Sequence, residues 1–186
     1  MSDSVEGAVR TSSRLPGILR AMEIWELVAR EEIRECIAGY NAHGDAGRMA
    51  EMLDVFTDDA VMEIEGVATQ GRDAIAEVMR DAGRSFVAYA KAAGVPRGGP
   101  VLRHFTSTVA IRVVSETQAQ ASLYYFVLMQ HGLDHWGRYD DEYRRVDGRW
   151  RISRRREWME GAIDGGFGVR ALAQRGTAGP ATADGG

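Results

Sequence analysis

The sequence predicts an α+β fold in which helices cover one face of a curved antiparallel β-sheet. Apolar residues recur at helical spacing through most of the first part of the chain, up to about residue 93. Residues 101–158 instead show alternating apolar residues in four long segments separated by turn residues. Because sequential strands joined by short turns usually pair antiparallel, this order favours one sheet with the helices on one side.

The first helix is predicted over about Met22–Asn41, where apolar residues fall three and four positions apart. Gly44 should stop this helix, since glycine is the usual residue just past a helix end. Asp45 then falls where it could cap a short second helix that begins near Met49. Capping alone would explain this aspartate, so its presence does not by itself indicate a site.

A hairpin and a further helix follow. Alternation over Phe56–Gly66 predicts a strand, and Val67–Gln70 predicts its short return. The next helix is predicted from Ala74 to about Ala93. Asp147-Gly148 is a strong signal for a two-residue hairpin turn. The four later strands are predicted at Leu102–Val114, Gln118–Leu133, Trp136–Val146 and Arg149–Trp158.

The length of 186 residues fits one domain with tails, since domains average about 150 residues. We expect the domain to cover residues 21–160. The polar residues 1–20 should form a flexible arm, and the Gly/Ala-rich residues 161–186 should form a flexible tail, because they can bury little apolar surface.

Composition excludes several classes of protein. A net charge of −4 argues against a nucleic-acid binder. The chain lacks an apolar run of about 18 residues, so no membrane span is expected. A single cysteine, Cys36, favours a reducing, cytoplasmic setting. Neither metal-ligand spacing nor a glycine-rich phosphate loop occurs, so we expect no metal and no cofactor.

His104 is the candidate general base, because imidazole titrates near neutral pH and a neighbouring carboxylate can fix its tautomer. Strand alternation places His104, Thr106 and Thr108 on one face, which would suit a polar stripe on a pocket wall. A histidine bonded to a nearby acid for structural reasons alone would give the same pattern.

The last strand carries a second candidate. Alternation places Arg154 on one face with Trp150 and Ile152. A charged side chain on an apolar face is costly unless it is paired. Arg154 could therefore bind a substrate oxyanion or carboxylate, and pairing with an internal acid is an equally good explanation.

Five segments in this order resemble the SnoaL-like group of the nuclear transport factor 2-like superfamily over about Met22–Met159. They are YNAHGD at 40–45, FTDDAVMEIEG at 56–66, TQGRDAI at 69–75, RHFTSTVAI at 103–111 and GRYDDEYRRVDGRWRISRR at 137–155. The resemblance implies a cone-shaped barrel, in which a strongly bent sheet wraps three helices around an apolar pocket. It also implies association through the outer sheet face.

Scytalone dehydratase, bile acid dehydratase and hexachlorocyclohexane dehydrochlorinase, which share this fold, use an aspartate after the first helix and a histidine at the start of a strand. The resemblance assigns these roles to Asp45 and His104. Tyr40 lies five residues before Asp45, where the bile acid and dehydrochlorinase enzymes have an assisting tyrosine or lysine. The bile acid enzyme has a second acid on the following strand. This sequence has Tyr124 and Tyr125 there, so leaving-group protonation would fall to tyrosine.

These observations favour a cofactor-independent lyase or isomerase acting on a small hydrophobic, cyclic substrate. His104 would remove a proton, Asp45 would orient the imidazole, and Tyr40 with Tyr124 or Tyr125 would donate a hydrogen bond to the reacting oxygen. Two alternatives remain open: a non-catalytic ligand-binding or assembly protein, and the small subunit of an aromatic-ring dioxygenase. A homodimer or a higher homo-oligomer is expected, because the strands Gln118–Leu133 and Arg149–Trp158 carry apolar residues on both faces.

Overall fold

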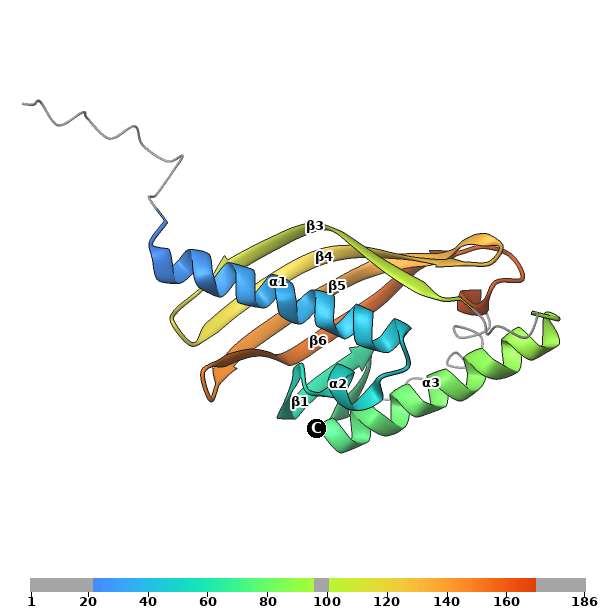
Figure 1. Ribbon diagram of the computed structural model, residues 1–186, viewed down its shortest axis with the longest axis horizontal. Coiled ribbons are helices and arrows are strands. Elements are labelled where there is room, and N and C mark those ends of the chain that lie inside the picture. Colours follow the sequence, from blue (N-terminus) through green and yellow to red (C-terminus); the bar gives the residue numbers. More distant parts are fainter. Residues whose placement is uncertain (1–21, 96–100, 170–186) are drawn as a thin grey trace, which may run out of the picture.

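One curved six-stranded sheet carries the helices on one side (Figure 1). The computed structural model describes residues 22–95 and 101–169, so the predicted arm over residues 1–20 lies outside the described residues. The helices are α1 (Ile24–Asp45), α2 (Met49–Leu53) and α3 (Arg72–Ala92). The strands are β1 (Phe56–Ile64), β2 (Val67–Gln70), β3 (Arg103–Val113), β4 (Gln118–Met129), β5 (Gly132–Val146) and β6 (Arg149–Ala162). The predicted α+β class is therefore confirmed.

The strands lie in the order β2-β1-β6-β5-β4-β3. The predicted antiparallel pairing holds for the run from β3 to β6. The last strand also pairs with β1, and this contact is parallel. The turn at Asp147-Gly148 has positive φ at both residues, 52° and 75°, as a tight hairpin of this type requires.

The core lies between the helices and the inner face of the sheet. α1 contributes a buried stripe at Ala29, Ile33 and Ile37, which follows the predicted helical spacing. The sheet contributes the fully buried Leu123 and Ile152. Within the described ranges, none of the helices combines the length and apolar character that crossing a membrane would take.

The end of α1 differs from the prediction. The helix runs through Gly44 and ends at Asp45, so Gly44 is not its stop. Gly47 has the positive φ of 69°, its N–H donates to the Gly44 carbonyl, and the Arg48 N–H donates to the His43 carbonyl. These two bonds form a Schellman motif. The residue that precedes α2 is Arg48, so the interpretation of Asp45 as its cap is also wrong.

A bulge in β3 changes which side chains face inward. The register against β4 shifts between Ser107 and Ala110, and Thr108 has a positive φ of 51°. His104 and Thr106 are partly buried, but Thr108 is exposed and Ile111 is buried. The predicted alternation is therefore correct up to Thr106 and reversed beyond the bulge.

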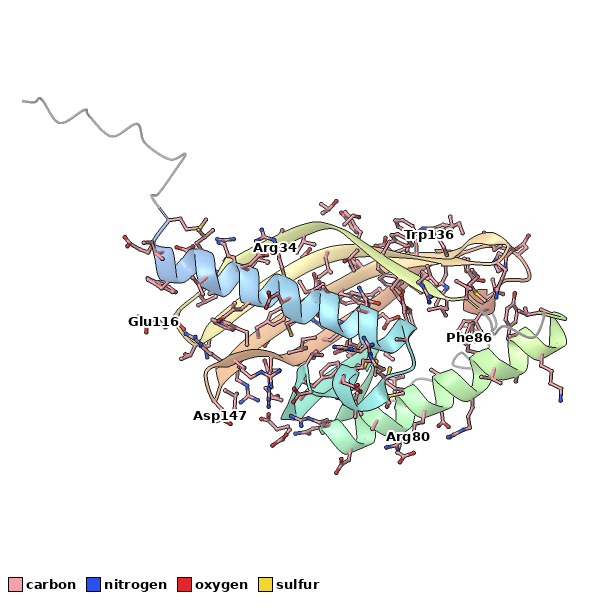
Figure 2. All side chains as sticks on the ribbon, in the orientation of Figure 1. Arg34, Arg80, Phe86, Glu116, Trp136 and Asp147 are labelled. Atoms are coloured by element: carbon pink, nitrogen blue, oxygen red, sulfur yellow. The ribbon has the colours of Figure 1, made fainter. Side chains whose placement is uncertain are left out.

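The predicted tail begins at residue 161, whereas β6 runs through Ala162 and residues 163–169 pack back against the sheet. The backbone N–H groups of Phe167 and Gly168 donate to the Asp134 carboxylate at 2.8 and 2.9 Å. The Phe167 ring packs against Phe86 of α3, with the ring centroids 5.5 Å apart. Figure 2 shows Phe86 close to this turn. The remainder of the predicted tail lies outside the described residues.

Candidate active site

The end of α1 and the start of β3 bring an aspartate and a histidine into contact. The Asp45 Oδ1 lies 2.7 Å from the His104 Nδ1, and the Asp45 Oδ2 accepts a bond of 3.0 Å from the His104 backbone N–H. The His104 side chain is 24% exposed and the Asp45 side chain 10%. The contact is therefore sheltered, and the imidazole keeps some accessible surface.

This contact fixes the proton on the imidazole. An ionised carboxylate only accepts hydrogen bonds, so the His104 Nδ1 must carry the hydrogen. In the neutral ring Nε2 is then the unprotonated nitrogen and can accept a proton. Asp45 ends a helix, where a negative charge is disfavoured by the helix dipole. Its two bonds to His104 offset that cost.

The two predicted tyrosines of β4 lie on opposite faces of the sheet. Tyr125 is 2% exposed and faces the helices, whereas Tyr124 is 52% exposed on the outer face. Tyr125 lies opposite Thr106 in the β3–β4 register, two positions along β3 from His104. The fold therefore gathers His104, Thr106 and Tyr125 on one inner surface. Tyr124 cannot reach that surface.

Tyr40 lies in the core rather than in the hydrogen-bond set of the pair. Its ring meets Phe56 and Tyr139 edge-on, with centroids 5.8 and 6.3 Å away. Its hydroxyl points to the Met79 sulfur at 3.9 Å, which is a weak contact. Burial raises the pKa of Tyr40 to about 12, so the hydroxyl keeps its proton.

The buried arginine of the last strand is Arg155, not Arg154. Arg154 pairs with Glu63 at 2.8 Å and is partly exposed. Arg155 is fully buried and binds both carboxylate oxygens of Asp141, at 2.8 and 2.7 Å. Its guanidinium lies 4.2 Å from the ring centroid of Tyr40 and equally far from that of Tyr139. Its Nη1 has no hydrogen-bond partner in the described chain.

The sequence matches the family model of the SnoaL-like domain over residues 25–156. The chain belongs to the SnoaL-like family. Among curated proteins, no match was found.

Solved structures of other SnoaL-like and cystatin-like proteins share the fold. A protein from Novosphingobium aromaticivorans, provisionally named a scytalone dehydratase, is 23% identical with a TM-score of 0.62, over 75% of this chain and 89% of that one. A hexachlorocyclohexane dehydrochlorinase from Novosphingobium barchaimii is 16% identical with a TM-score of 0.61, over 75% and 92%. A protein of unknown function from Mycobacterium tuberculosis is 21% identical, with a TM-score of 0.61 over 74% and 79%. At these identities the likeness establishes the fold alone.

Sequence reasoning missed three inner charged residues of this SnoaL-like domain. Asp141 and Arg155 form the buried pair, and Glu157 accepts a hydrogen bond of 3.3 Å from the Tyr125 hydroxyl. Alternation selected Arg154 because the β5–β6 register shifts at Glu142 and moves the inward position by one residue. A run of three arginines carries no signal of its own to show which one turns inward.

A cavity of about 740 Å³ lies away from the pair, between α1, α2 and the β5–β6 turn. Its walls carry the charged residues Glu32, Glu35, Glu51, Asp54 and Arg149 beside apolar ones that include Cys36, Val55 and Trp150. Neither Asp45 nor His104 lines it. Charged walls do not suit a hydrophobic substrate, so the hydrogen-bonded pair locates the candidate site better than this cavity does.

Within residues 22–95 and 101–169, no three His, Cys, Asp or Glu side chains lie where they could share a metal ion.

Proposed function

We propose that the protein is a cofactor-independent lyase or isomerase that removes a proton from a small hydrophobic, cyclic substrate. The observation that carries this proposal is the Asp45–His104 contact, which holds the proton on Nδ1 and leaves Nε2 as the base. Membership of the SnoaL-like family supports it, since a dehydrochlorinase has the same fold. Asp45 would stabilise the imidazolium formed when Nε2 takes the proton.

Other inner residues would bind the substrate. Thr106 lies two residues from His104 on the inner surface and would donate a hydrogen bond to a carbonyl oxygen. The Tyr125 hydroxyl, which donates to Glu157, would have to exchange that bond for one to the substrate. The Arg155 Nη1, which is buried and unpartnered, is the cation best placed to meet negative charge that develops on the substrate. It would replace Arg154 in that role. An apolar pocket around these groups stays a prediction from the family resemblance.

The test is deuterium uptake from D₂O at the α-carbon of a panel of cyclic ketones that includes α-tetralone. Proton removal next to a carbonyl needs no leaving group, so this exchange reports the base alone. His104→Gln should slow exchange by about 100- to 10,000-fold, the usual contribution of a general base. The matched control is His43→Gln, since His43 bonds to Arg48 outside the site. Absence of His104-dependent exchange on every ketone would contradict the proposal and favour a ligand-binding protein.

We also propose that the protein forms a homodimer through the outer face of the sheet. Tyr124 and Phe105 are exposed there, and Phe105 stacks on Phe126 with centroids 5.0 Å apart. Trp136 lies on the side of the sheet away from the helices (Figure 2). Such an exposed aromatic surface is typical of an association site. Light scattering should show twice the 20.4 kDa chain mass, and Trp136→Glu should give monomers. A wild-type monomer at micromolar concentration would contradict this.

A further inference from the structure

The cavity of about 740 Å³ between α1, α2 and the β5–β6 turn takes no part in the proposed proton removal. α1 borders it with one face, on which residues three and four positions apart lie together. These residues of α1 are Glu32, Glu35, Cys36 and Gly39. The cavity is large enough for a small molecule, since ligand pockets usually measure about 300–1,000 Å³.

Ion pairs hold the walls of this cavity together. Asp54, just after α2, pairs with Arg149 at 2.9 Å and with Arg151 at 3.2 Å, both on β6. Glu32 of α1 lies 3.8 Å from the guanidinium of Arg145 on β5. These pairs join both helices to the last hairpin, and they neutralise the charges of Asp54 and Glu32 within the protein.

Two further carboxylates at the cavity lack a cation. Glu35 of α1 and Glu51 of α2 border it and are exposed. Within residues 22–95 and 101–169, neither of them forms an ion pair. The exposed side of the cavity is therefore negative, which suits a cation.

Trp150 adds a buried hydrogen-bond donor to the same cavity. It is the second residue of β6, borders the cavity and is only 5% exposed. Its indole Nε1 has no hydrogen-bond partner among the residues that the structure describes. An indole N–H can only donate, and a buried donor without an acceptor is costly. A ligand that presents an oxygen acceptor would satisfy this group.

Cys36 is the other buried side chain that borders the cavity. Its Sγ donates to the Val55 carbonyl at 3.7 Å. Burial raises the pKa of Cys36 to about 12, so the thiol stays uncharged at neutral pH. The buried part of the cavity is thus uncharged with one donor to satisfy, whereas the acids without a partner are exposed.

From these features we propose that this cavity is a second binding site, which takes a small organic amine that also carries a carbonyl oxygen. The ammonium group faces the carboxylates of Glu35 and Glu51 on the exposed side. The carbonyl oxygen accepts the hydrogen of the Trp150 Nε1, and the apolar part of the amine lies between the two. His104 does not border the cavity, so binding here is separate from proton removal.

The test follows the indole N–H signals of protein labelled with ¹⁵N-tryptophan. The chain has four tryptophans, and Trp150→Phe identifies the signal of Trp150. The probe is 4-(aminomethyl)benzamide, with procainamide as a longer second amine, and each should shift the Trp150 signal. Benzylamine lacks the carbonyl and 4-(hydroxymethyl)benzamide lacks the charge, so each should bind about 10-fold more weakly than 4-(aminomethyl)benzamide. In Trp150→Phe, measured by calorimetry, the advantage over benzylamine should disappear.

Gly39 offers a way to fill the cavity without disturbing the helix. A Cβ at Gly39 would lie 3.6 Å from the Val55 Cγ1, which is an ordinary contact. Leucine also favours a helix more than glycine does. Gly39→Leu should therefore fold, as its melting temperature would show, and weaken binding at least about 10-fold. The matched control is Gly83→Leu on α3, where a Cβ meets open space and binding should not change.

The charge is tested by Glu35→Gln/Glu51→Gln, which should weaken binding about 5- to 10-fold. Glu77→Gln/Glu116→Gln makes the same change in net charge away from the cavity and should have no effect. If Gly39→Leu does not fold, the comparison of these two double variants decides.

A Trp150 signal that neither amine shifts at millimolar concentration would overturn the proposal. Binding that Gly39→Leu leaves unchanged would also overturn it, because the amine would then lie elsewhere. Equal affinity of the wild type for benzylamine and 4-(aminomethyl)benzamide would show that the indole does not select a carbonyl, and would contradict the ligand class. His104→Gln should bind the amine as the wild type does, so the failure of the proposed proton removal would leave this site standing.

Discussion

Asp45 and Asp134 each hold the Nδ1 atom of a histidine at the same distance. The carboxylate of Asp45 lies 2.7 Å from the Nδ1 of His104, and that of Asp134 lies 2.7 Å from the Nδ1 of His135. Their surroundings differ. The bonds of Asp45 described above both come from His104, whereas Asp134 is fully buried and gathers groups from several parts of the chain.

Asp134 acts as a junction. Besides His135, it contacts the Nε2 of His131 at 3.0 Å and accepts the backbone N–H groups of Phe167 and Gly168. These bonds fasten the C-terminal turn to the β4–β5 hairpin. The comparison shows that the pair itself does not define an active site. What matters is whether the carboxylate serves one imidazole that remains accessible or is saturated by donors that hold the chain together.

The largest expected difference is in stability. Asp134→Ala leaves several buried donors without a partner and should lower the free energy of unfolding by about 3–5 kcal/mol. Asp45→Ala removes bonds to a single partly exposed residue and should cost about 1–2 kcal/mol. Urea denaturation of both variants measures the two values. Equal losses of unfolding free energy would show that Asp134 does not hold the chain together more strongly than Asp45 does.

For activity the order should reverse, with the change at Asp45 costing more than the change at Asp134. Asp45→Asn disturbs the tautomer of His104 and the stabilisation of its cation, at a cost of about 1.5–3 kcal/mol, or on the order of 10- to 100-fold in exchange rate. The matched Asp134→Asn should lose stability but retain exchange at temperatures where it is folded. Exchange by α-tetralone checks both variants. An Asp134 variant that folds and has lost exchange would place the second pair in the mechanism.

A smaller effect is expected in acid. Burial alone would raise the pKa of Asp134, but the bonds from His135, Gly168 and Phe167 outweigh it and lower the pKa from 3.8 to about 2. A carboxyl whose pKa is depressed by folding stabilises the fold above its unfolded pKa and loses that contribution as pH falls through the folded value. The contribution, about 2 kcal/mol, should therefore be present above pH 4 and lost towards pH 2.

The measurement is the gap in unfolding free energy between wild type and Asp134→Asn across this range. Glu116→Gln is the control for a change in surface charge. The gap should be constant from pH 7 to about pH 4 and then narrow. A gap that does not narrow in acid would mean that the carboxylate is not the group that holds the C-terminal turn.

The sequence predicted local structure well where short-range chemistry decides it. The hairpin at Asp147-Gly148 and the strand Val67–Gln70 follow from turn residues and alternation, and both occur as expected. The end of α1 was misplaced because two glycines lie within four residues, and only the tertiary fold selects Gly47.

The residues of the candidate site were predicted less well than the secondary structure. The contact between Asp45 and His104 joins residues far apart in the chain, and only the resemblance to a known family indicated it. Arg155 and Glu157 were missed because a register shift changes the parity of β6, which no local pattern reveals. Asp134 was missed because two of its partners, Phe167 and Gly168, lie in a segment whose composition suggested a free tail.

The parallel contact between β1 and β6 has a consequence for how the chain is made. β6 lies between β1 and β5, so the last strand within the described residues fills the middle of the sheet. Until it leaves the ribosome, the β1–β2 hairpin and the β3–β5 meander have no strand to join them. Pairings this distant in sequence are slow to form, and open strand edges favour misassembly during that interval. Stalling synthesis before Arg149 should therefore leave two separate, protease-sensitive pieces rather than a partly closed sheet.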